Sequence, residues 1–135
     1  LLDRAPADAP RVARWDDPKA PLDARARAYL EINCAHCHNP AGAASNSGLF
    51  LELDRQEAVT IGVGKRPVAA GRGSGGREFA IAPGDAEASI LIYRLRSTDP
   101  GIAMPELGRA TAHDEGIALL AQWIDSMPAP RTENR

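Results

Sequence analysis

The spacing of apolar residues predicts three helices, and the first begins behind Pro21. From there to residue 34, apolar side chains recur at helical intervals, and a proline suits the first turn of a helix. The stripe consists of Leu22, Ala26, Tyr29 and Leu30. Asn39, Pro40 and Gly42 follow soon afterwards and favour a turn. We therefore expect a first helix over residues 21–34.

Two more amphipathic segments lie in the second half of the chain. Pro83 and Gly84 predict a turn with Asp85 as the N-cap of a helix that ends near residue 96. Thr111 and Asp114 fit a capping box for a helix that continues to about residue 127. The stripes of these helices are Ala88, Leu91, Ile92 and Leu95, then Ile117, Leu120, Ala121 and Ile124. Because each stripe must be buried, we expect Tyr29 and Leu30 of the first helix to pack on the last helix.

The segments between these helices read as loops. Residues 41–82 hold many glycines and no sustained helical period. Alternating apolar positions in 49–53 and a short apolar run at 79–81 would allow a small two-stranded ribbon. The fold class expected is therefore all-α, with about three main helices, long loops and room for one small β-ribbon.

The expected organisation is one domain with two polar ends. Residues 1–20 are rich in Pro, Asp, Arg and Ala and read as a linker or arm, which Trp15 is expected to anchor to the body. Residues 21–127 form the domain, and residues 128–135 form a polar tail. Since the chain begins at Leu1 without an apolar leader, we expect that a signal peptide, a lipid tether or a preceding domain stood upstream.

Length and charge argue against several classes of function. A chain of 135 residues fits one domain with a modest core. Its net charge of −2 provides no basic face of the kind that nucleic acid or an anionic membrane attracts. There is also no run of about 18 apolar residues that would span a bilayer. We expect neither nucleic-acid binding nor direct membrane insertion of this segment.

Both cysteines of the chain lie in the sequence Cys34-Ala35-His36-Cys37-His38. This is the C-x-x-C-H pattern of covalent haem attachment, in which each thiol adds to one vinyl group of the porphyrin. His38 then lies beside the second thioether and approaches the iron from that side. A zinc site would need further Cys or His ligands at suitable spacing, and a thioredoxin-like pair would need an α/β chain. Neither pattern is present, so haem attachment is the preferred interpretation.

The order of these features resembles class I c-type cytochromes. The motif helix comes first, the middle is rich in loops, a Met-Pro pair comes late, and a helix closes the chain. More closely, the segments CAHCHNPAG, SGLFLELD, PGDAEASILIYRL and MPELG resemble monohaem domains appended to larger bacterial periplasmic cytochromes. The resemblance implies that Cys34 and Cys37 form the thioethers of one haem c. It also implies that His38 is the proximal iron ligand and Met104 the distal one.

The sequence around Met104 supports that role independently. It is surrounded by Gly101, Pro105 and Gly108, a setting in which the backbone presents a single side chain inward. The other methionine, Met127, ends an amphipathic helix and is better explained as core packing. His113 is the alternative imidazole late in the chain, and His36 is expected at the surface.

The expected function is single-electron transfer by the bound haem, by a carrier rather than an enzyme. Haem attachment to C-x-x-C-H follows export, so we expect a periplasmic or equivalent extracytoplasmic location, with or without an upstream tether. The partners would be redox proteins or an adjacent redox domain. Two alternatives stay open: a haem-based ligand-binding or sensor module, and the electron-entry domain of a larger redox enzyme.

Two weaker signals lie in the long middle loop. Residues 71–76 match the pattern G-x-G-x-x-G, but no βαβ unit surrounds them, so nucleotide binding is not expected. The second signal is a run of basic residues without an acid, consisting of Lys65, Arg66, Arg72 and Arg77. It reads as a solvated loop, as a source of one arginine for a haem propionate, or as a surface for an acidic redox partner.

Overall fold

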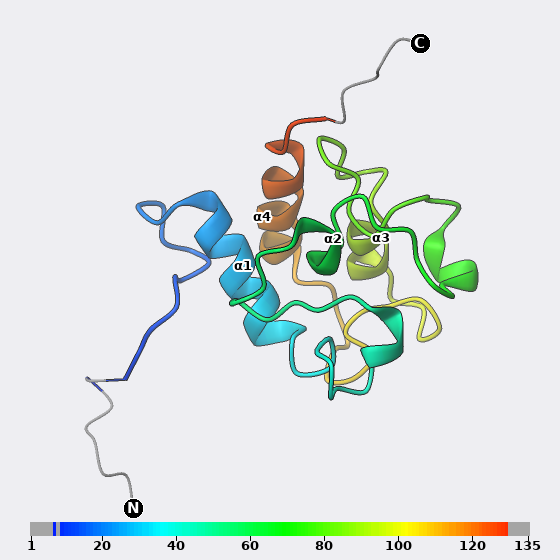
Figure 1. The fold of residues 1–135 in the computed structure, drawn as a ribbon, viewed down its shortest axis with the longest axis horizontal. Coiled ribbons are helices and arrows are strands. Elements are labelled where there is room, and N and C mark those ends of the chain that lie inside the picture. The colour runs from blue at the N-terminus through cyan, green and yellow to red at the C-terminus, as the bar shows by residue number, and fades with distance from the viewer. Residues whose placement is uncertain (1–6, 8, 130–135) are drawn as a thin grey trace, which may run out of the picture.

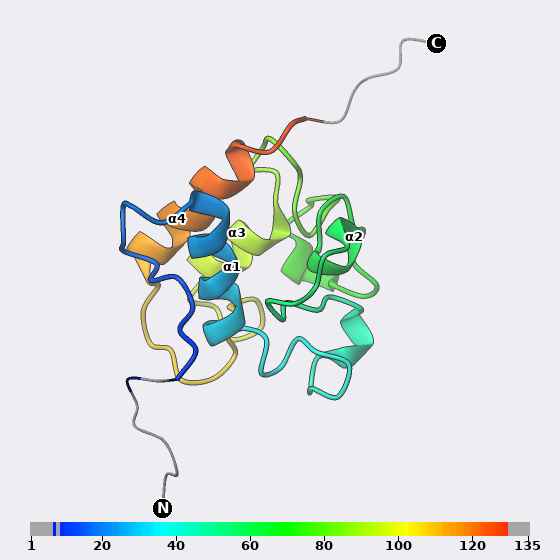
Figure 2. The ribbon, with the colours of Figure 1, turned by 60° about the vertical axis from the view of Figure 1, so that its left-hand side comes forward.

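The computed structural model describes residue 7 and residues 9–129. Its α-helices are α1 (Leu22–Asn33), α2 (Ala58–Ile61), α3 (Ile90–Arg96) and α4 (Asp114–Asp125), and its 3₁₀ turns are η2 (Ser45–Ser47) and η3 (Gly71–Ser74). Helix α4 packs between α1 and α3, and long loops cover the rest of the molecule (Figures 1 and 2). Over the described ranges there is no sheet. The architecture is thus mostly helical, in agreement with the all-α expectation.

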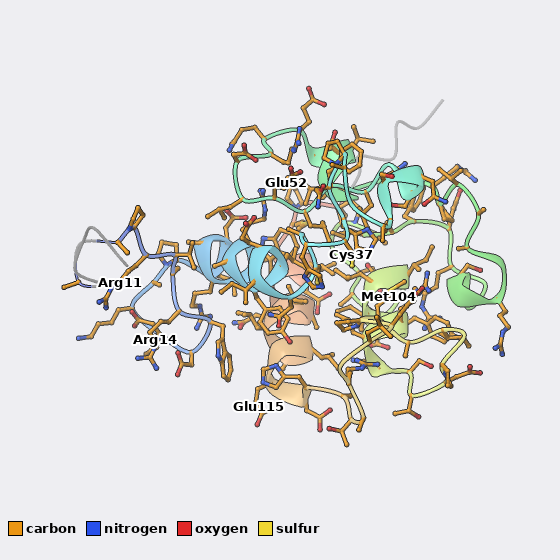
Figure 3. All side chains as sticks on the ribbon, turned by 90° about the horizontal axis from the view of Figure 1, so that it is seen from below. Arg11, Arg14, Cys37, Glu52, Met104 and Glu115 are labelled. Carbon is orange, nitrogen blue, oxygen red and sulfur yellow. The ribbon has the colours of Figure 1, made fainter. Side chains whose placement is uncertain are left out.

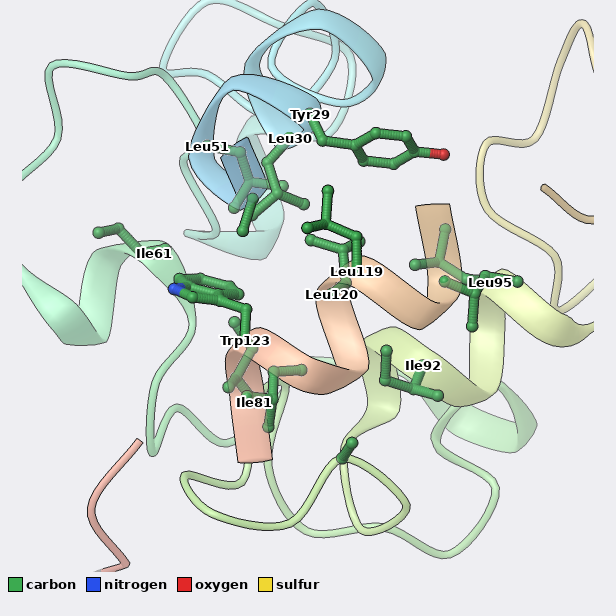
Figure 4. Close-up of a cluster of buried hydrophobic side chains, with 14 of the residues drawn as sticks. Tyr29, Leu30, Leu51, Ile61, Ile81, Ile92, Leu95, Leu119, Leu120 and Trp123 are labelled. Carbon is green, nitrogen blue, oxygen red and sulfur yellow. The ribbon is translucent and has the colours of Figure 1, made fainter. Parts of the chain in front are cut away.

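The predicted packing of the first helix on the last is confirmed. Leu30 of α1 and Leu120 and Ile124 of α4 have no exposed surface, and Ala121 lies against the same cluster. Figure 4 shows Tyr29 and Leu30 of α1 beside Leu119 and Leu120 of α4. Full burial of such side chains stabilises the fold by about 1.5–3 kcal/mol each.

A polar contact joins the same two helices. The indole Nε1 of Trp123 in α4 donates to Asp23 Oδ1 in the first turn of α1, at 2.9 Å. This bond satisfies a donor that would otherwise be buried, because Trp123 is only 5% exposed. No helix in the described part of the chain is long and apolar enough to cross a membrane.

Both later helices begin further along the chain than their patterns predicted. Helix α3 starts at Ile90 rather than behind Asp85, because the preceding residues use their polar groups in a compact turn. In that turn, Asp85 Oδ1 accepts the N–H of Ala88 at 2.9 Å, and the Ser89 hydroxyl donates to the Asp85 carbonyl at 2.9 Å. The capping box predicted before α4 is also wrong, because the N-cap is His113 and no side chain caps that end.

The small ribbon expected from residues 49–53 and 79–81 does not form. The Phe50 N–H donates to the carbonyl of Thr60, and the Leu51 N–H donates to the carbonyl of His38, each at 2.9 Å. The first bond ties the segment to the short helix α2, which the sequence pattern did not predict. Ile81 instead makes an isolated bridge with Val63. The partners that a ribbon would need are therefore engaged elsewhere.

Candidate haem-attachment site

The motif begins where α1 ends, and helix geometry continues through it. The Cys34 N–H donates to the Leu30 carbonyl at 2.9 Å. Further along, the N–H groups of Cys37 and His38 both donate to the Cys34 carbonyl, at 3.1 and 2.9 Å. The two thiols therefore leave the chain one turn apart. This is the placement that two neighbouring vinyl groups of one porphyrin require.

Every backbone carbonyl of the motif accepts a hydrogen bond. Besides the Cys34 carbonyl, those of Ala35 and His36 accept from the Asn39 side-chain amide, at 2.7 and 3.3 Å. The carbonyl of Cys37 accepts from the Ala44 N–H at 3.0 Å, and that of His38 from the Leu51 N–H. These bonds hold the motif backbone in one conformation before any group is attached to it.

The segment behind the motif folds back very closely on it. A Cβ placed on Gly42 would overlap the carbonyl of Cys37 and lie 2.8 Å from the Asn39 amide nitrogen. Only a residue without a side chain allows this approach. Gly42 therefore supports the same tight turn that Asn39 organises, and the sequence signal Asn-Pro-x-Gly carries real structural information.

Both motif cysteines are free thiols. Burial, followed by the neighbouring Cys37, raises the pKa of Cys34 to about 12. At neutral pH the Cys34 sulfur consequently carries its proton.

The imidazole of His38 is half-buried and lies against the segment 47–49. Its Nδ1 is 3.4 Å from the Ser47 hydroxyl, a long hydrogen bond. Burial lowers the pKa of His38, and a hydrogen bond with the Leu49 backbone partly opposes that shift. A neutral imidazole held through Nδ1 keeps Nε2 for a metal ion.

Met104 lies in a loop that faces the motif. Its N–H donates to the Arg94 carbonyl at 3.1 Å, and its side chain is half-buried. Pro105 and Leu107, which follow it, line one cavity together with Cys34 of the motif. Figure 3 shows Cys37 and Met104 in the same central region of the molecule. The structure thus brings the motif and the methionine loop together.

A cavity of about 250 Å³ opens between them. The cavity is lined by Cys34, which follows α1, by His113 and Ile117 at α4, and by Pro105, Leu107 and Arg109 of the loop. A group attached through the Cys34 sulfur would enter this largely apolar space. The position of the Cys34 thiol therefore fits attachment of a haem that enters this cavity, although His38 and Met104 are not among the residues that line it.

His113 is occupied by other partners. Its Nδ1 is 2.8 Å from the Tyr29 hydroxyl, its ring stacks on Tyr29, and Trp15 packs edge-on against it at 5.1 Å between ring centroids. Trp15 thereby joins the N-terminal arm to the body, as expected. A Cβ on Gly116 would overlap the Tyr29 hydroxyl and lie 2.6 Å from His113 Nδ1, so only glycine admits this pair without displacement. His36 is exposed, as predicted.

The basic run of the middle loop is engaged with acidic and carbonyl groups. Arg66 pairs with Glu78, and Arg72 pairs with Asp99 at 2.9 Å. Arg77 donates to the Glu87 carbonyl at 2.7 Å. The run is therefore not one continuous basic surface. Sequence reasoning missed two other arginines, Arg94 and Arg109, which flank Met104 and which no motif marks.

The motif turn, its imidazole and the facing methionine loop define the chain as a c-type cytochrome domain. In agreement with this, the family model described as Planctomycete cytochrome C (PSCyt1) matches residues 34–107. The match covers more than half of the chain and includes the motif and Met104, so the chain belongs to this family. Membership implies covalently bound haem c and a haem-based electron-transfer role. No curated protein and no solved structure matches the chain.

Proposed function

We propose that this domain is a one-electron carrier that holds a single haem c between His38 and Met104, in the manner of class I cytochromes. Cys34 and Cys37 form the two thioethers. The observation that carries the proposal is the free Cys34 thiol in the wall of a cavity that Pro105, Leu107 and Arg109, from the loop of Met104, also line. His38 follows one helical turn after Cys34, since its N–H donates to the Cys34 carbonyl. When bound, the haem supplies the one-electron chemistry, and its potential depends on the axial ligands.

Met104 is favoured over His113 as the distal ligand because the His113 side chain already has hydrogen-bonding and stacking partners. The imidazole of His113 is held by the Tyr29 hydroxyl at 2.8 Å and lies between two aromatic rings. Binding iron through Nδ1 would break that hydrogen bond, and binding through Nε2 would displace the Glu115 carboxylate, which lies 3.7 Å from that nitrogen. The described contacts of Met104 are made through its backbone, so its sulfur can turn to the iron without loss of another bond.

The location and the partners belong to the same proposal. Haem attachment to this motif follows export, so the domain acts in the periplasm or an equivalent extracytoplasmic space, alone or tethered through upstream sequence. It exchanges electrons with redox proteins or with an adjacent redox domain, and it resembles domains that larger periplasmic cytochromes carry. It performs no catalysis of its own in this proposal.

Spectroscopy of the purified holoprotein tests the axial ligands. Covalent attachment predicts that haem stays on the polypeptide during acid-acetone extraction. Methionine ligation predicts a long-wavelength sulfur-to-iron charge-transfer band in the oxidised protein, and Met104→Ala should abolish it and lower the reduction potential. Met127→Ala, which removes the other methionine, is the matched control and should keep the band.

Three results would contradict the proposal. Loss of the native spectrum in His113→Ala, with Met104→Ala unchanged, would assign the distal position to His113. Rapid binding of carbon monoxide to the reduced wild-type protein would show an open distal site and favour a ligand-binding or sensor module. Release of free haem by acid-acetone would exclude covalent attachment.

A further inference from the structure

Arg109 closes the loop that carries Met104. Its guanidinium donates through NH1 to the carbonyl of Leu95 and through NH2 to the carbonyl of Ser97. These two carbonyls lie at the last residues of α3 and just behind it, where helix carbonyls lack intrahelical partners and the helix dipole favours a cation. One side chain thus joins residue 109 to residues 95–97, and Met104 lies within the ring that this closes.

Arg94 holds the same loop from inside α3. Its Nε donates to the carbonyl of Ile102 at 2.8 Å, and its own carbonyl accepts the N–H of Met104 at 3.1 Å. Met104 therefore lies between two fixed points, one two residues before it and one five residues after it. A Cβ on Gly73 would lie 3.3 Å from the Arg94 guanidinium carbon, so η3 also limits where this side chain can go.

We propose that Arg109 and Arg94 form a clamp that keeps the Met104 sulfur on the haem iron, and that both are positioning residues. This inference rests on the proposed ligation by Met104. The thioether–iron bond is weak compared with an imidazole–iron bond, so its occupancy depends on how closely the loop is held. A loop freed at one end would let Met104 leave the iron and would let an external ligand bind.

The chemistry of arginine explains why this residue type serves here. The guanidinium is planar and always charged, and its two terminal nitrogens reach two carbonyls in fixed directions at once. A lysine at position 109 would keep the charge but could not span both carbonyls in the same geometry. A glutamine would lose the charge and one of the two bonds.

The test compares three variants of the holoprotein. Arg109→Gln removes the clamp, Arg109→Lys is the conservative variant, and Arg96→Gln is the control, since Arg96 lies in the last turn of α3 but forms an exposed ion pair with Glu87. For each we would measure the affinity of the oxidised protein for imidazole, which competes with Met104, together with the charge-transfer band and the denaturant midpoint.

The expected result separates positioning from general stability. Loss of hydrogen bonds from a charged group should raise the imidazole affinity of Arg109→Gln about tenfold or more and weaken the band. Arg109→Lys should lie between this variant and the wild type, and Arg96→Gln should match the wild type. Arg94→Lys, which keeps a cation but loses the Nε donor, should also raise the affinity.

Clear outcomes would overturn the clamp. In the first, Arg109→Gln has a lower denaturant midpoint but the same imidazole affinity and charge-transfer band as Arg96→Gln. Arg109 would then support the fold without positioning Met104. If Arg109→Gln does not fold, an unchanged imidazole affinity in both Arg109→Lys and Arg94→Lys overturns the clamp equally. Absence of the charge-transfer band from the wild type would instead overturn Met104 ligation itself, and the clamp with it.

Discussion

The helices and the loops of this domain are held together by different forces. Helices α1, α3 and α4 meet through apolar side chains such as Leu30, Ile92 and Leu120, each at most 1% exposed. The loops of residues 35–89 and 97–113 contribute fewer buried apolar side chains and are held by polar side chains that bind backbone carbonyls and N–H groups. Because the motif and Met104 belong to the loops, the candidate site depends mainly on the polar kind of support.

Arg27 is the strongest example of that support. It lies on α1 and is only 8% exposed. Its NH2 group donates to the carbonyls of Glu52, Leu53 and Arg55, at 3.1, 3.3 and 2.8 Å. One buried cation thus fixes the turn at residues 52–55, which has no helix or strand of its own. Buried carbonyls need partners, and irregular segments must take them from side chains.

The comparison of helices and loops predicts that the largest loss of stability follows a substitution in the apolar core between the helices. Leu120 has no exposed surface and lies in the cluster between α1 and α4. Leu120→Ala should lower the free energy of unfolding by about 2–5 kcal/mol, because it removes buried methyl groups and leaves a cavity. Denaturant unfolding of the holoprotein measures this. A cost near zero would mean that the helix packing does not support the fold.

A smaller effect is expected when the loop support is removed. Arg27→Gln keeps a polar side chain but loses the charge and the reach to three carbonyls. The free energy of unfolding should fall by about 1.5–3 kcal/mol, the range for hydrogen bonds to charged groups. Arg14→Gln, which breaks an exposed ion pair with Asp16, is the control and should change little. Equal effects in the two variants would remove the distinction between buried and exposed arginines.

The smallest effect concerns acid pH and Asp99, which begins the loop of Met104. A hydrogen bond from the Gly101 N–H, together with the nearby Arg72 guanidinium, lowers the pKa of Asp99 below its ordinary value. The ionised form is therefore favoured in the folded loop. The stabilisation of the folded loop by ionised Asp99 is complete above the ordinary pKa of an aspartate. It is lost as pH falls through the lowered pKa of Asp99.

An acid titration of the charge-transfer band measures that contribution. In Asp99→Asn the group no longer titrates, so the loss of the band on acidification should become less steep than in the wild type. Near neutral pH the variant should differ little, because the ion pair with Arg72 is exposed. An identical acid transition in both proteins would show that Asp99 does not control the loop.

Sequence reasoning succeeded where one local rule decides the structure. The 3.6-residue period placed α1 and α4 and their contact, and the spacing of Cys34, Cys37 and His38 predicted the chemistry of the motif. It failed where backbone groups choose partners far away in sequence. The absent ribbon and the contact of His38 with Ser47 depend on such choices. The start of α3 depends instead on a local turn, in which Asp85 accepts hydrogen bonds from Ala88 and Ser89. Arg27, Arg94 and Arg109 carried no signal, because nothing in a sequence distinguishes an arginine bound to carbonyls from one in solvent.

The absence of a side chain at Gly116 has an evolutionary consequence. The Tyr29 hydroxyl and the His113 imidazole share the space that a side chain at Gly116 would fill. These three residues are therefore expected to change together in evolution, although Tyr29 of α1 and Gly116 of α4 are 87 residues apart in sequence. Among relatives that also share the two helices, a tyrosine and a histidine at the first two positions should occur together with glycine at the third. Lineages that gain a side chain there should have replaced at least one partner first.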